Sequence, residues 1–473
     1  MKLTLINPWW NKNKPQHSKV QQLLQSKYPP LGIAFLAGAL ERLGHEVQII
    51  DAEAEELDDA DIAGRIETFG ADLIGITSTT WTLAGLRETA AYLKKTFPKT
   101  EIIIGGPHVG EFPGQTLEME EFDYGVIGEG EKVIENFLRA YEGNKDFSGV
   151  RGLVYRKDGK IVVNEREAAL TDIDFNPAWH LFPIEKYTHV MARKKRFATM
   201  FSSRGCPYRC TFCDANSRIG KEIRFRSPEN LLAEVDTLYN TYGVREICFY
   251  DDTLTLDRNR IKRFCELLIE RKYDLIWECR TRVDCINEEL MKVMARAGCY
   301  RIRFGVEAGN ETILNVLKKD ITLDQARTAF RLAKKYKIET VAYFMLGSPS
   351  ETEGTMQDTI DFSMEIEPDY VLFSPTRLMH KGTQMHRWAV ENGYISRDHW
   401  ERFIRGEDVD PIPILETETL KKEMITRYVR KAYRSFYFRP KYLFRTARRI
   451  NSWADLKITT LIGLNFLSSS FDG

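Results

Sequence analysis

The stretch that decides the fold is Arg204-Gly205-Cys206-Pro207-Tyr208-Arg209-Cys210-Thr211-Phe212-Cys213, which spaces three cysteines as C-x3-C-x2-C. It follows a strand predicted over 197–202 and holds three of the chain's 8 cysteines. A tetrahedral zinc site needs four ligands, whereas three thiolates on one loop suit an iron–sulfur cluster that keeps one iron open to a small molecule. Zinc with a fourth ligand from elsewhere, or three structural cysteines, is the alternative.

Strands and helices alternate downstream of this loop. Strands are predicted over 197–202, 246–250, 276–278, 301–305, 339–345 and 370–373, with helices between them, for example over 228–239, 259–271 and 322–336. Six strand–helix steps in one segment predict a partial (β/α)6 barrel with its chemistry at the carboxyl ends of the strands.

The first part of the chain alternates in the same way. Strands are predicted over 3–6, 46–50, 73–77, 101–104 and 124–127, with helices over 31–43 and 83–95. This α/β pattern predicts a doubly wound parallel sheet, which binds ligands beyond the carboxyl ends of its strands. Those ends carry small and turn-forming residues that would let backbone approach a large flat ligand with a phosphate-bearing tail: Asn7-Pro8, Thr77-Ser78-Thr79-Thr80, Gly105-Gly106-Pro107-His108 and Gly128-Glu129-Gly130-Glu131.

The pattern divides the chain into four parts. We expect a ligand-binding domain over 1–145, a linker over 146–195 with a β-hairpin at the Asp158-Gly159 turn, the barrel over 196–380, and a helical basic region over 381–473. Aromatic residues interleave with basic ones over 421–450. This tail could contact an anionic lipid surface, or it could be a solvated helical cap whose rings pack on the barrel.

Composition excludes several classes of protein. The chain has 473 residues, 43% of them hydrophobic, which argues against a disordered or fibrous chain. Its 68 basic and 68 acidic residues cancel, so we expect no general nucleic-acid binding. The sequence has no apolar run of about 18 residues and no signal peptide, and a disulfide framework would not confine its cysteines to 206–299. We therefore expect a cytoplasmic protein, with peripheral membrane contact through the tail as an option.

The cysteine triplet, with Phe212 before its last member, resembles the signature of radical S-adenosylmethionine enzymes. The resemblance extends over about 197–375 through motifs at or just after predicted strands: Phe249-Tyr250-Asp251-Asp252-Thr253, Arg282-Val283-Asp284, Phe304-Gly305-Val306-Glu307-Ala308-Gly309 and Phe344-Met345-Leu346-Gly347-Ser348-Pro349. It implies that Cys206, Cys210 and Cys213 hold a 4Fe–4S cluster. The fourth iron would chelate S-adenosylmethionine, and its reductive cleavage would release a 5′-deoxyadenosyl radical.

The same resemblance implies binding roles for other side chains. Asp251 or Asp252 would accept a hydrogen bond from the methionyl ammonium, Arg282 would pair with its carboxylate, and Glu307 would bond to the ribose. Phe212 and Leu346-Gly347 would pack near the adenine. As alternatives, Asp251-Asp252 could cap a helix and form a turn, and Arg282 with Glu307 could be an ion pair of the barrel core.

The first 145 residues resemble the cobalamin-binding domain that precedes the barrel in one branch of this superfamily. The matching pieces include Pro29-Pro30-Leu31-Gly32-Ile33 and Gly44-His45-Glu46-Val47. The implied contacts are Asn7, Pro8, Thr77, Ser78, Thr79, Gly105, Gly106, His108, Gly128, Glu129 and Gly130. Asn7-Pro8-Trp9-Trp10 departs from the D-x-H-x-x-G motif of histidine-ligated cobalamin, so this loop is expected to offer no histidine to the cobalt. His108 is not expected to replace it, and should contact a loop or the nucleotide tail of cobalamin instead. The alternative is an empty flavodoxin-like domain.

The resemblance leaves several functions open. The first is methylation of an unactivated carbon in a hydrophobic, lipid or tetrapyrrole-like substrate, with a flavodoxin- or ferredoxin-type electron donor. The second is oxidative ring closure of the type catalysed by the anaerobic magnesium-protoporphyrin IX monomethyl ester cyclase. The remaining two are a non-catalytic cobalamin or redox sensor and a zinc-binding interaction protein. Neither of these would need the ordered strand-end motifs, so the motifs disfavour both.

Overall fold

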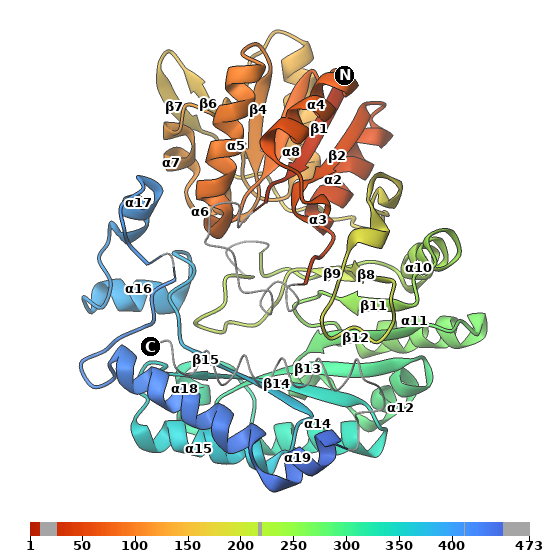
Figure 1. The fold of residues 1–473 in the computed structure, drawn as a ribbon, viewed down its shortest axis with the longest axis vertical. Coiled ribbons are helices and arrows are strands. Elements are labelled where there is room, and N and C mark those ends of the chain that lie inside the picture. Colours follow the sequence, from red (N-terminus) through yellow and green to blue (C-terminus); the bar gives the residue numbers. More distant parts are fainter. Residues whose placement is uncertain (10–25, 216–219, 411, 448–473) are drawn as a thin grey trace.

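The computed structural model describes residues 1–9, 26–215, 220–410 and 412–447. These residues form two large sheets, mostly parallel in the N-terminal part and fully parallel in the later part, with the N-terminal sheet above and the other below (Figure 1). Both sheets have helices packed against them, as the sequence predicts for an α/β protein.

The upper sheet has seven strands in the order β2-β1-β3-β4-β5-β6-β7. Its parallel strands are β1 (Lys2–Asn7), β2 (Glu46–Asp51), β3 (Leu73–Thr77), β4 (Glu101–Gly105) and β5 (Tyr124–Val126). The chain leaves β1 on one side to form β2 and then returns to its other side to form β3. The order of the strands therefore reverses at β1, which is where doubly wound sheets bind ligands.

The β-hairpin expected in the linker is present and belongs to this sheet. It consists of β6 (Leu153–Lys157) and β7 (Lys160–Val163), and β6 pairs antiparallel to β5. The turn residues Asp158 and Gly159 both have positive φ, as a tight hairpin turn requires. The hairpin thus extends the sheet by two strands instead of standing apart from it.

Helices cover both faces of the upper sheet. The buried cluster that holds Leu3 and Leu5 also holds the inner faces of α2 (Leu31–Arg42) and α8 (Gly130–Glu142). A second buried cluster joins the opposite face of the sheet to α4 (Asp59–Phe69) and α5 (Leu83–Thr96). Shorter elements complete this part: α3 (Ala52–Glu55), η1 (Thr80–Thr82), α6 (Pro107–Glu111) and α7 (Pro113–Glu118).

The lower sheet is the expected six-stranded partial barrel. Its order is β15-β14-β13-β12-β11-β8, and every neighbouring pair is parallel. The strands are β8 (Phe197–Met200), β11 (Glu246–Phe249), β12 (Ile276–Thr281), β13 (Cys299–Glu307), β14 (Glu339–Leu346) and β15 (Tyr370–Pro375). The intervening helices are α10 (Pro228–Tyr242), α11 (Arg258–Arg271), α12 (Glu288–Arg296), α13 (Glu311–Val316), α14 (Leu323–Lys335) and α15 (Glu353–Glu365). A short antiparallel pair, β9 (Ser203–Arg204) and β10 (Arg224–Phe225), leads into and out of the cysteine loop.

The last described segment is helical and packs on the rest of the chain. It comprises α16 (Gln384–Glu391), α17 (His399–Ile404), α18 (Lys422–Tyr437) and α19 (Pro440–Ala447). Trp400 of α17 reaches the upper part of the molecule, where its ring centroid lies 6.1 Å from that of Phe112. The expectation that the aromatic residues of the tail pack on the barrel is confirmed for Tyr428, Phe436 and Tyr442, which are buried.

Helix α18 closes the free edge of the barrel sheet. The Tyr437 hydroxyl donates to the Val371 carbonyl at 2.8 Å and accepts from the Val371 amide at 3.0 Å. The Tyr433 hydroxyl accepts from the Phe373 amide at 3.1 Å. Side-chain hydroxyls thus satisfy backbone groups of β15 that would otherwise need another strand or water.

Candidate functional site

The carboxyl ends of the two sheets face one cavity of about 420 Å³. From the upper sheet it is lined by residues in and just after β3, β4 and β5, and from the lower part by residues of β9 and residues that follow β8 and β11. The lining includes Gly75, Thr77, Gly105, Gly106, Gly128, Glu129 and Gly130 above, and Phe201, Ser203, Arg204, Tyr250, Asp251 and Asp252 below. Its walls are largely apolar, and its size is that of a typical small-molecule site.

Missing side chains create part of this cavity. Gly75 lies on β3 between Leu5 and Ile103, and a Cβ there would stand 2.7 Å from a methyl carbon of Leu5. Gly106 has φ +101°, and its Cβ would stand 2.4 Å from the Ser78 carbonyl oxygen. The cavity therefore runs between the sheet and helices α2 and α8, which contribute Ile33, Leu36 and Ile134. A glycine-lined slot with apolar walls fits a flat cofactor that inserts a tail into the sheet domain.

Six of the predicted cobalamin contacts line the cavity: Thr77, Gly105, Gly106, Gly128, Glu129 and Gly130. Asn7, Pro8, Ser78, Thr79 and His108 are not among the described lining residues. The Asn7 amide donates to Asp51, and the Ser78 hydroxyl donates to the Gly105 carbonyl. Thr79 caps η1. These polar groups shape the turns around the cavity.

His108 is fully buried beside Phe112, and its Nδ1 lies 3.2 Å from the Thr80 hydroxyl. Burial lowers the pKa of His108 to about 4, so the imidazole is neutral at physiological pH.

Three ion pairs fasten the upper domain to the strands on either side of the cysteine loop. Arg204 of β9 donates to Glu129 at 3.0 Å and to Glu131 at 2.6 Å, and Glu129 also accepts from Arg224. All four side chains are largely buried, and the Arg204 guanidinium stacks over the Phe35 ring at 5.1 Å. Burial would raise the pKa of Glu129, but the bonds and charges of Arg224 and Arg204 hold it below its ordinary value. Glu129 thus lines the cavity and joins the two domains.

The three cysteines lie on the loop that follows β9. Cys206 is buried, Cys210 is partly buried and Cys213 is exposed, and all are free thiols. Burial raises the pKa of the Cys206 and Cys210 thiols, and desolvation by the protein atoms around the Cys213 sulfur raises the pKa of that thiol to about 12 although the residue as a whole is exposed. A thiol with such a pKa becomes a thiolate at neutral pH only when a cation such as iron binds it.

The three cysteine sulfurs are not gathered around one point. Among the described residues, the one group of three metal-binding side chains whose ligand atoms all lie within 4.8 Å of one another is Glu111, Asp214 and His380. Sulfur ligands of one tetrahedral zinc ion lie about 3.8 Å apart, as bonds of about 2.3 Å require. The loop therefore does not hold its three sulfurs in the arrangement of a single zinc site.

Positive side chains surround Cys210. The Arg282 guanidinium lies 3.9 Å from its sulfur, and the ammonium of Lys319 lies above the Phe212 ring at 6.0 Å. Lys319 pairs with Glu307 at 2.8 Å, and Glu307 has the left-handed φ of +75° at a bulge in β13. Cations near the cluster loop would offset the negative charge of thiolates and sulfide.

The structure separates the two adjacent aspartates. Asp251 is buried and accepts from the Ser202 amide and from the hydroxyls of Ser202 and Ser203. Asp252 is exposed, and its charge acts on Cys206 and Cys213. Asp252 is therefore the one that faces the cysteines, whereas Asp251 holds the strand end in place.

Arg282 and Glu307 each have a partner within the protein. Arg282 makes two bonds to Asp284, at 2.9 and 3.0 Å, and one to the Lys319 carbonyl. The alternative that Arg282 and Glu307 pair with each other is wrong, because Arg282 pairs with Asp284 and Glu307 with Lys319.

The Leu346-Gly347 turn is fixed from two sides. The Gly347 and Ser348 amides donate to Glu351, and a Cβ on Gly347 would stand 2.7 Å from Ile425 of α18. Burial raises the pKa of Glu351 to about 7.

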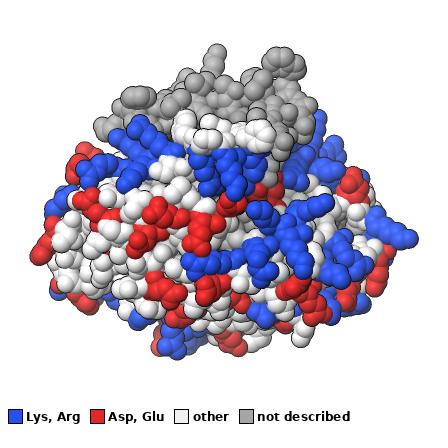
Figure 2. Space-filling model, turned by 90° about the horizontal axis from the view of Figure 1, so that it is seen from below, with Lys and Arg blue, Asp and Glu red and all other residues white. Residues whose placement is uncertain are grey.

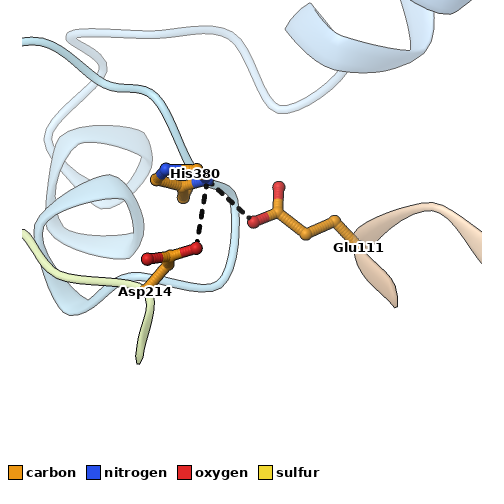
Figure 3. A group of neighbouring side chains, drawn as sticks. All are labelled: Glu111, Asp214 and His380. Carbon is orange, nitrogen blue, oxygen red and sulfur yellow. Dashed lines mark hydrogen bonds and ion pairs between the residues drawn. The ribbon is translucent and has the colours of Figure 1, made fainter. Parts of the chain in front are cut away.

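A second polar cluster, which the sequence analysis missed, borders the cysteine loop. His380 Nδ1 lies 3.1 Å from Glu111 of α6 and 3.6 Å from Asp214, which follows Cys213 (Figure 3). His380 follows β15, so this cluster joins the upper domain, the cysteine loop and the C-terminal part. The imidazole contacts both carboxylates, and these contacts hold the cluster together.

The molecule thus combines a doubly wound sheet, a partial barrel with a cysteine loop, and a cavity between the carboxyl ends of the two sheets. Family models match both parts: the radical SAM superfamily matches residues 200–363 and the B12 binding domain matches residues 22–138. The chain belongs to the radical SAM superfamily, in the branch whose members carry a cobalamin-binding domain and include methyltransferases.

Relatives align over nearly the whole chain. An uncharacterized methyltransferase of Pyrococcus horikoshii is 33% identical over 448 residues, which are 94% of either chain. The anaerobic magnesium-protoporphyrin IX monomethyl ester cyclase of Rubrivivax gelatinosus is 28% identical over 89% of this chain and 76% of its own. Among solved structures, the radical S-adenosylmethionine methyltransferase TsrM from Kitasatospora setae has a TM-score of 0.69 at 19% identity, covering 82% of this chain and 76% of its own.

Membership of this family settles the class and the cofactors. The radical SAM domain implies a 4Fe–4S cluster and S-adenosylmethionine, and the B12 binding domain implies cobalamin. Enzymes of this kind require a reductant and a substrate. Within the described ranges, no helix is both long and apolar enough to cross a membrane.

Proposed function

We propose that the protein methylates an unactivated carbon of a hydrophobic substrate, lipid-like or tetrapyrrole-like. The observation that supports this most strongly is the cavity that is lined by the glycines at the ends of the upper strands and, below, by Arg204, Asp251 and Asp252. If cobalamin binds along these glycines and S-adenosylmethionine beside Asp252, a substrate carbon placed in this cavity would meet both cofactors. When bound, the cluster with S-adenosylmethionine supplies radical hydrogen abstraction, and cobalamin supplies the methyl group.

The side chains divide the work of binding. Cys206, Cys210 and Cys213 would hold three irons, with Arg282 and Lys319 offsetting the negative charge near Cys210. Asp252, exposed on the cavity wall, would accept from the methionyl ammonium. Phe212 and the Leu346-Gly347 turn would border the adenine.

The bonds of Arg282 to Asp284 and of Glu307 to Lys319 change what we propose for these two residues. Arg282 has one guanidinium nitrogen directed at Cys210, so it would act on the cluster side and reach the methionyl carboxylate only with this nitrogen. Glu307 would meet the ribose while still paired with Lys319.

For cobalamin, the cavity-lining residues Thr77, Gly105, Gly106, Gly128, Glu129 and Gly130 would form the contacts. The buried neutral His108 would support the Gly105-Gly106 turn from behind, since it is packed on Phe112. The domain limits that we propose are those expected from the sequence, at 145, 195 and 380.

Oxidative ring closure is the second candidate, because the Rubrivivax gelatinosus cyclase aligns with most of this chain. Methyl-labelled S-adenosylmethionine distinguishes the two functions. Label in the product indicates methylation, and ring closure without label indicates cyclase chemistry.

The test of the proposal is anaerobic reconstitution of the full chain with iron, sulfide and cobalamin, followed by measurement of 5′-deoxyadenosine. We expect Cys206→Ala, Cys210→Ala and Cys213→Ala to lose the cluster absorbance and nearly all 5′-deoxyadenosine. Cys265→Ala is the matched control, because Cys265 is buried in α11 away from the loop. A protein that forms 5′-deoxyadenosine without iron, or cysteine variants as active as the control, would overturn the proposal.

For partners, we propose a flavodoxin- or ferredoxin-type electron donor and a peripheral contact with anionic lipid. Lys and Arg side chains gather on the lower face of the molecule (Figure 2), and Phe438, which follows α18, and Leu443 and Phe444 of α19 are at least half exposed. Truncation of the tail is a poor test, because α18 covers the barrel edge. Phe438→Ser with Leu443→Ser should instead reduce cosedimentation with phosphatidylglycerol vesicles, and unchanged binding would remove this contact from the proposal.

A further inference from the structure

The inner face of the barrel sheet carries a row of charged residues. The strand register places Glu278, Arg280, Arg301, Arg303 and Tyr343 on this face. Most of these charges are already paired. Glu278 is fully buried and lies within 3.4 Å of Arg301, Arg303 and His189. Burial alone would raise the pKa of Glu278, but His189 and the two arginines hold it well below the ordinary value.

Arg280 is different, because within the described ranges its guanidinium has no carboxylate partner and only the Tyr250 side chain as a hydrogen-bond partner. The centroid of the Tyr250 ring lies 3.7 Å from the guanidinium carbon. Glu278, the nearest acidic residue in the register, is shared by two other arginines and His189.

The contacts with Tyr250 leave most of the hydrogen-bonding capacity of Arg280 unused. A cation–π contact uses the flat face of the guanidinium, whereas its five N–H groups point outward in the plane. Arg280 is half-buried, so the donors that do not reach Tyr250 are partly withdrawn from water. A fork of donors in this setting matches a carboxylate or phosphate, which accept two parallel bonds.

The position of Arg280 connects it with the cavity and with an apolar surface. Tyr250, on which it stacks, lines the cavity between the domains. On the same inner face, Tyr343 pairs in register with Leu372 of β15, whose side chain is 40% exposed. Three strand spacings separate β12 from β15, about 14 Å in all. A ligand with an acidic end and an apolar body could thus cover both Arg280 and Leu372.

We propose that Arg280 is the anchor for an oxyanion of the substrate, a carboxylate or a phosphoryl group, and that the substrate is an amphiphilic acid whose apolar part lies toward Leu372. This inference rests on the proposed function and narrows its substrate class. The anion would enter from the cavity side and bind Arg280 on the sheet face that also holds Tyr343. It would thereby fix the distance of the reacting carbon from both cofactor sites.

Binding of simple probes to the holoprotein tests this without any turnover. Calorimetry would compare octanoate, octyl phosphate and octanol. We expect one or both anions to bind at least about 10-fold more tightly than octanol, and the better of the two identifies the oxyanion. Arg280→Met should weaken that anion about 10- to 100-fold and leave octanol unchanged, since a bond to a charged group is lost. Arg263→Met, an exposed arginine of α11, is the matched control and should bind like the wild type.

Two further arms keep the outcome clear. Arg280→Lys keeps the charge but not the fork, so it should bind the anion with an affinity between those of wild type and Arg280→Met, even if the methionine variant folds poorly. Saturating S-adenosylmethionine should leave anion binding intact. If it abolishes binding, Arg280 holds the methionyl carboxylate, and the proposal is overturned. Equal binding by wild type and both variants would overturn it as well. Failure of the proposed function would appear separately, as absence of 5′-deoxyadenosine from the wild-type enzyme.

Discussion

Removing Glu129 should loosen the joint between the two domains. Its carboxylate pairs with Arg204 at 3.0 Å and with Arg224, and it accepts from the Leu170 amide at 2.8 Å. The exposed fractions of these three side chains are 12%, 14% and 6%. Glu129→Ala therefore leaves two buried arginines short of a partner. Loss of one member of a buried ion pair costs about 3–5 kcal/mol, and for a unit of this size each kcal/mol lowers the melting temperature by about 2–4 °C.

The expected decrease in melting temperature is thus about 6–20 °C, measured by scanning calorimetry on the cofactor-free chain. Glu131→Ala should cost less, because Arg204 keeps Glu129. Glu135→Ala, which breaks an exposed pair with Arg139 one helical turn away, should cost about 0.3–0.5 kcal/mol and serves as the control. The pKa of Glu129 is held below its ordinary value, so this stabilisation is present above pH 4.5 and is lost as the pH falls through the folded-state pKa. If Glu129→Ala melts within 2 °C of Glu135→Ala, about the effect of 1 kcal/mol, the reasoning is refuted.

Three other perturbations have defined outcomes. Burial raises the pKa of Glu351 to about 7, so the free energy of unfolding falls by up to about 3 kcal/mol as the pH rises from 4.5 past 7. Glu351→Gln should therefore flatten the change in melting temperature between pH 5.5 and 8.5. An unaltered pH profile would contradict the assignment. Tyr437→Phe removes the hydroxyl that bonds the Val371 backbone and should speed exchange of that amide at least about 5-fold, which hydrogen exchange detects. Gly105→Val should lower the amount of retained cobalamin about 10-fold, because its Cβ has room 3.9 Å from Val126 and its side chain enters the cavity. Gly64→Val on α4 is the control and should retain cobalamin fully. Equal retention by the two variants would argue against this cavity as the cobalamin site.

The sequence predicts the two sheets because their signals are local. Strand runs such as 73–77 carry dense apolar residues bounded by turn formers, and the structure places β3 at the same limits. The turns at the ends of β4 and β5 could also be predicted from their glycines, since Gly106 and Gly128 adopt positive φ values that other residues avoid.

Contacts between distant segments could not be predicted in this way. Glu129 and Arg204 are 75 residues apart, and Glu111 and His380 are 269 apart, so no periodicity connects them. Asp251 and Asp252 follow the same strand, but one residue of offset turns the first toward Ser202 and the second toward the cysteines. Arg280 lies on β12 and Arg282 follows two residues later. Arg282 pairs with the Asp284 carboxylate, whereas Arg280 stacks on Tyr250, and only the three-dimensional positions of these neighbours make the difference.

The tyrosine hydroxyls that terminate β15 also bear on how this chain avoids self-association. A barrel that does not close presents a bare strand, with exposed Leu372 on it, to any other chain in solution. Because Tyr433 and Tyr437 occupy the backbone groups of that strand, an incoming strand would have to displace α18 first. A shortened form that ends before residue 422 would therefore be prone to aggregate through pairing of exposed β15 edges. Its poor solubility would then result from the loss of α18 over that edge, and not from the loss of a binding partner.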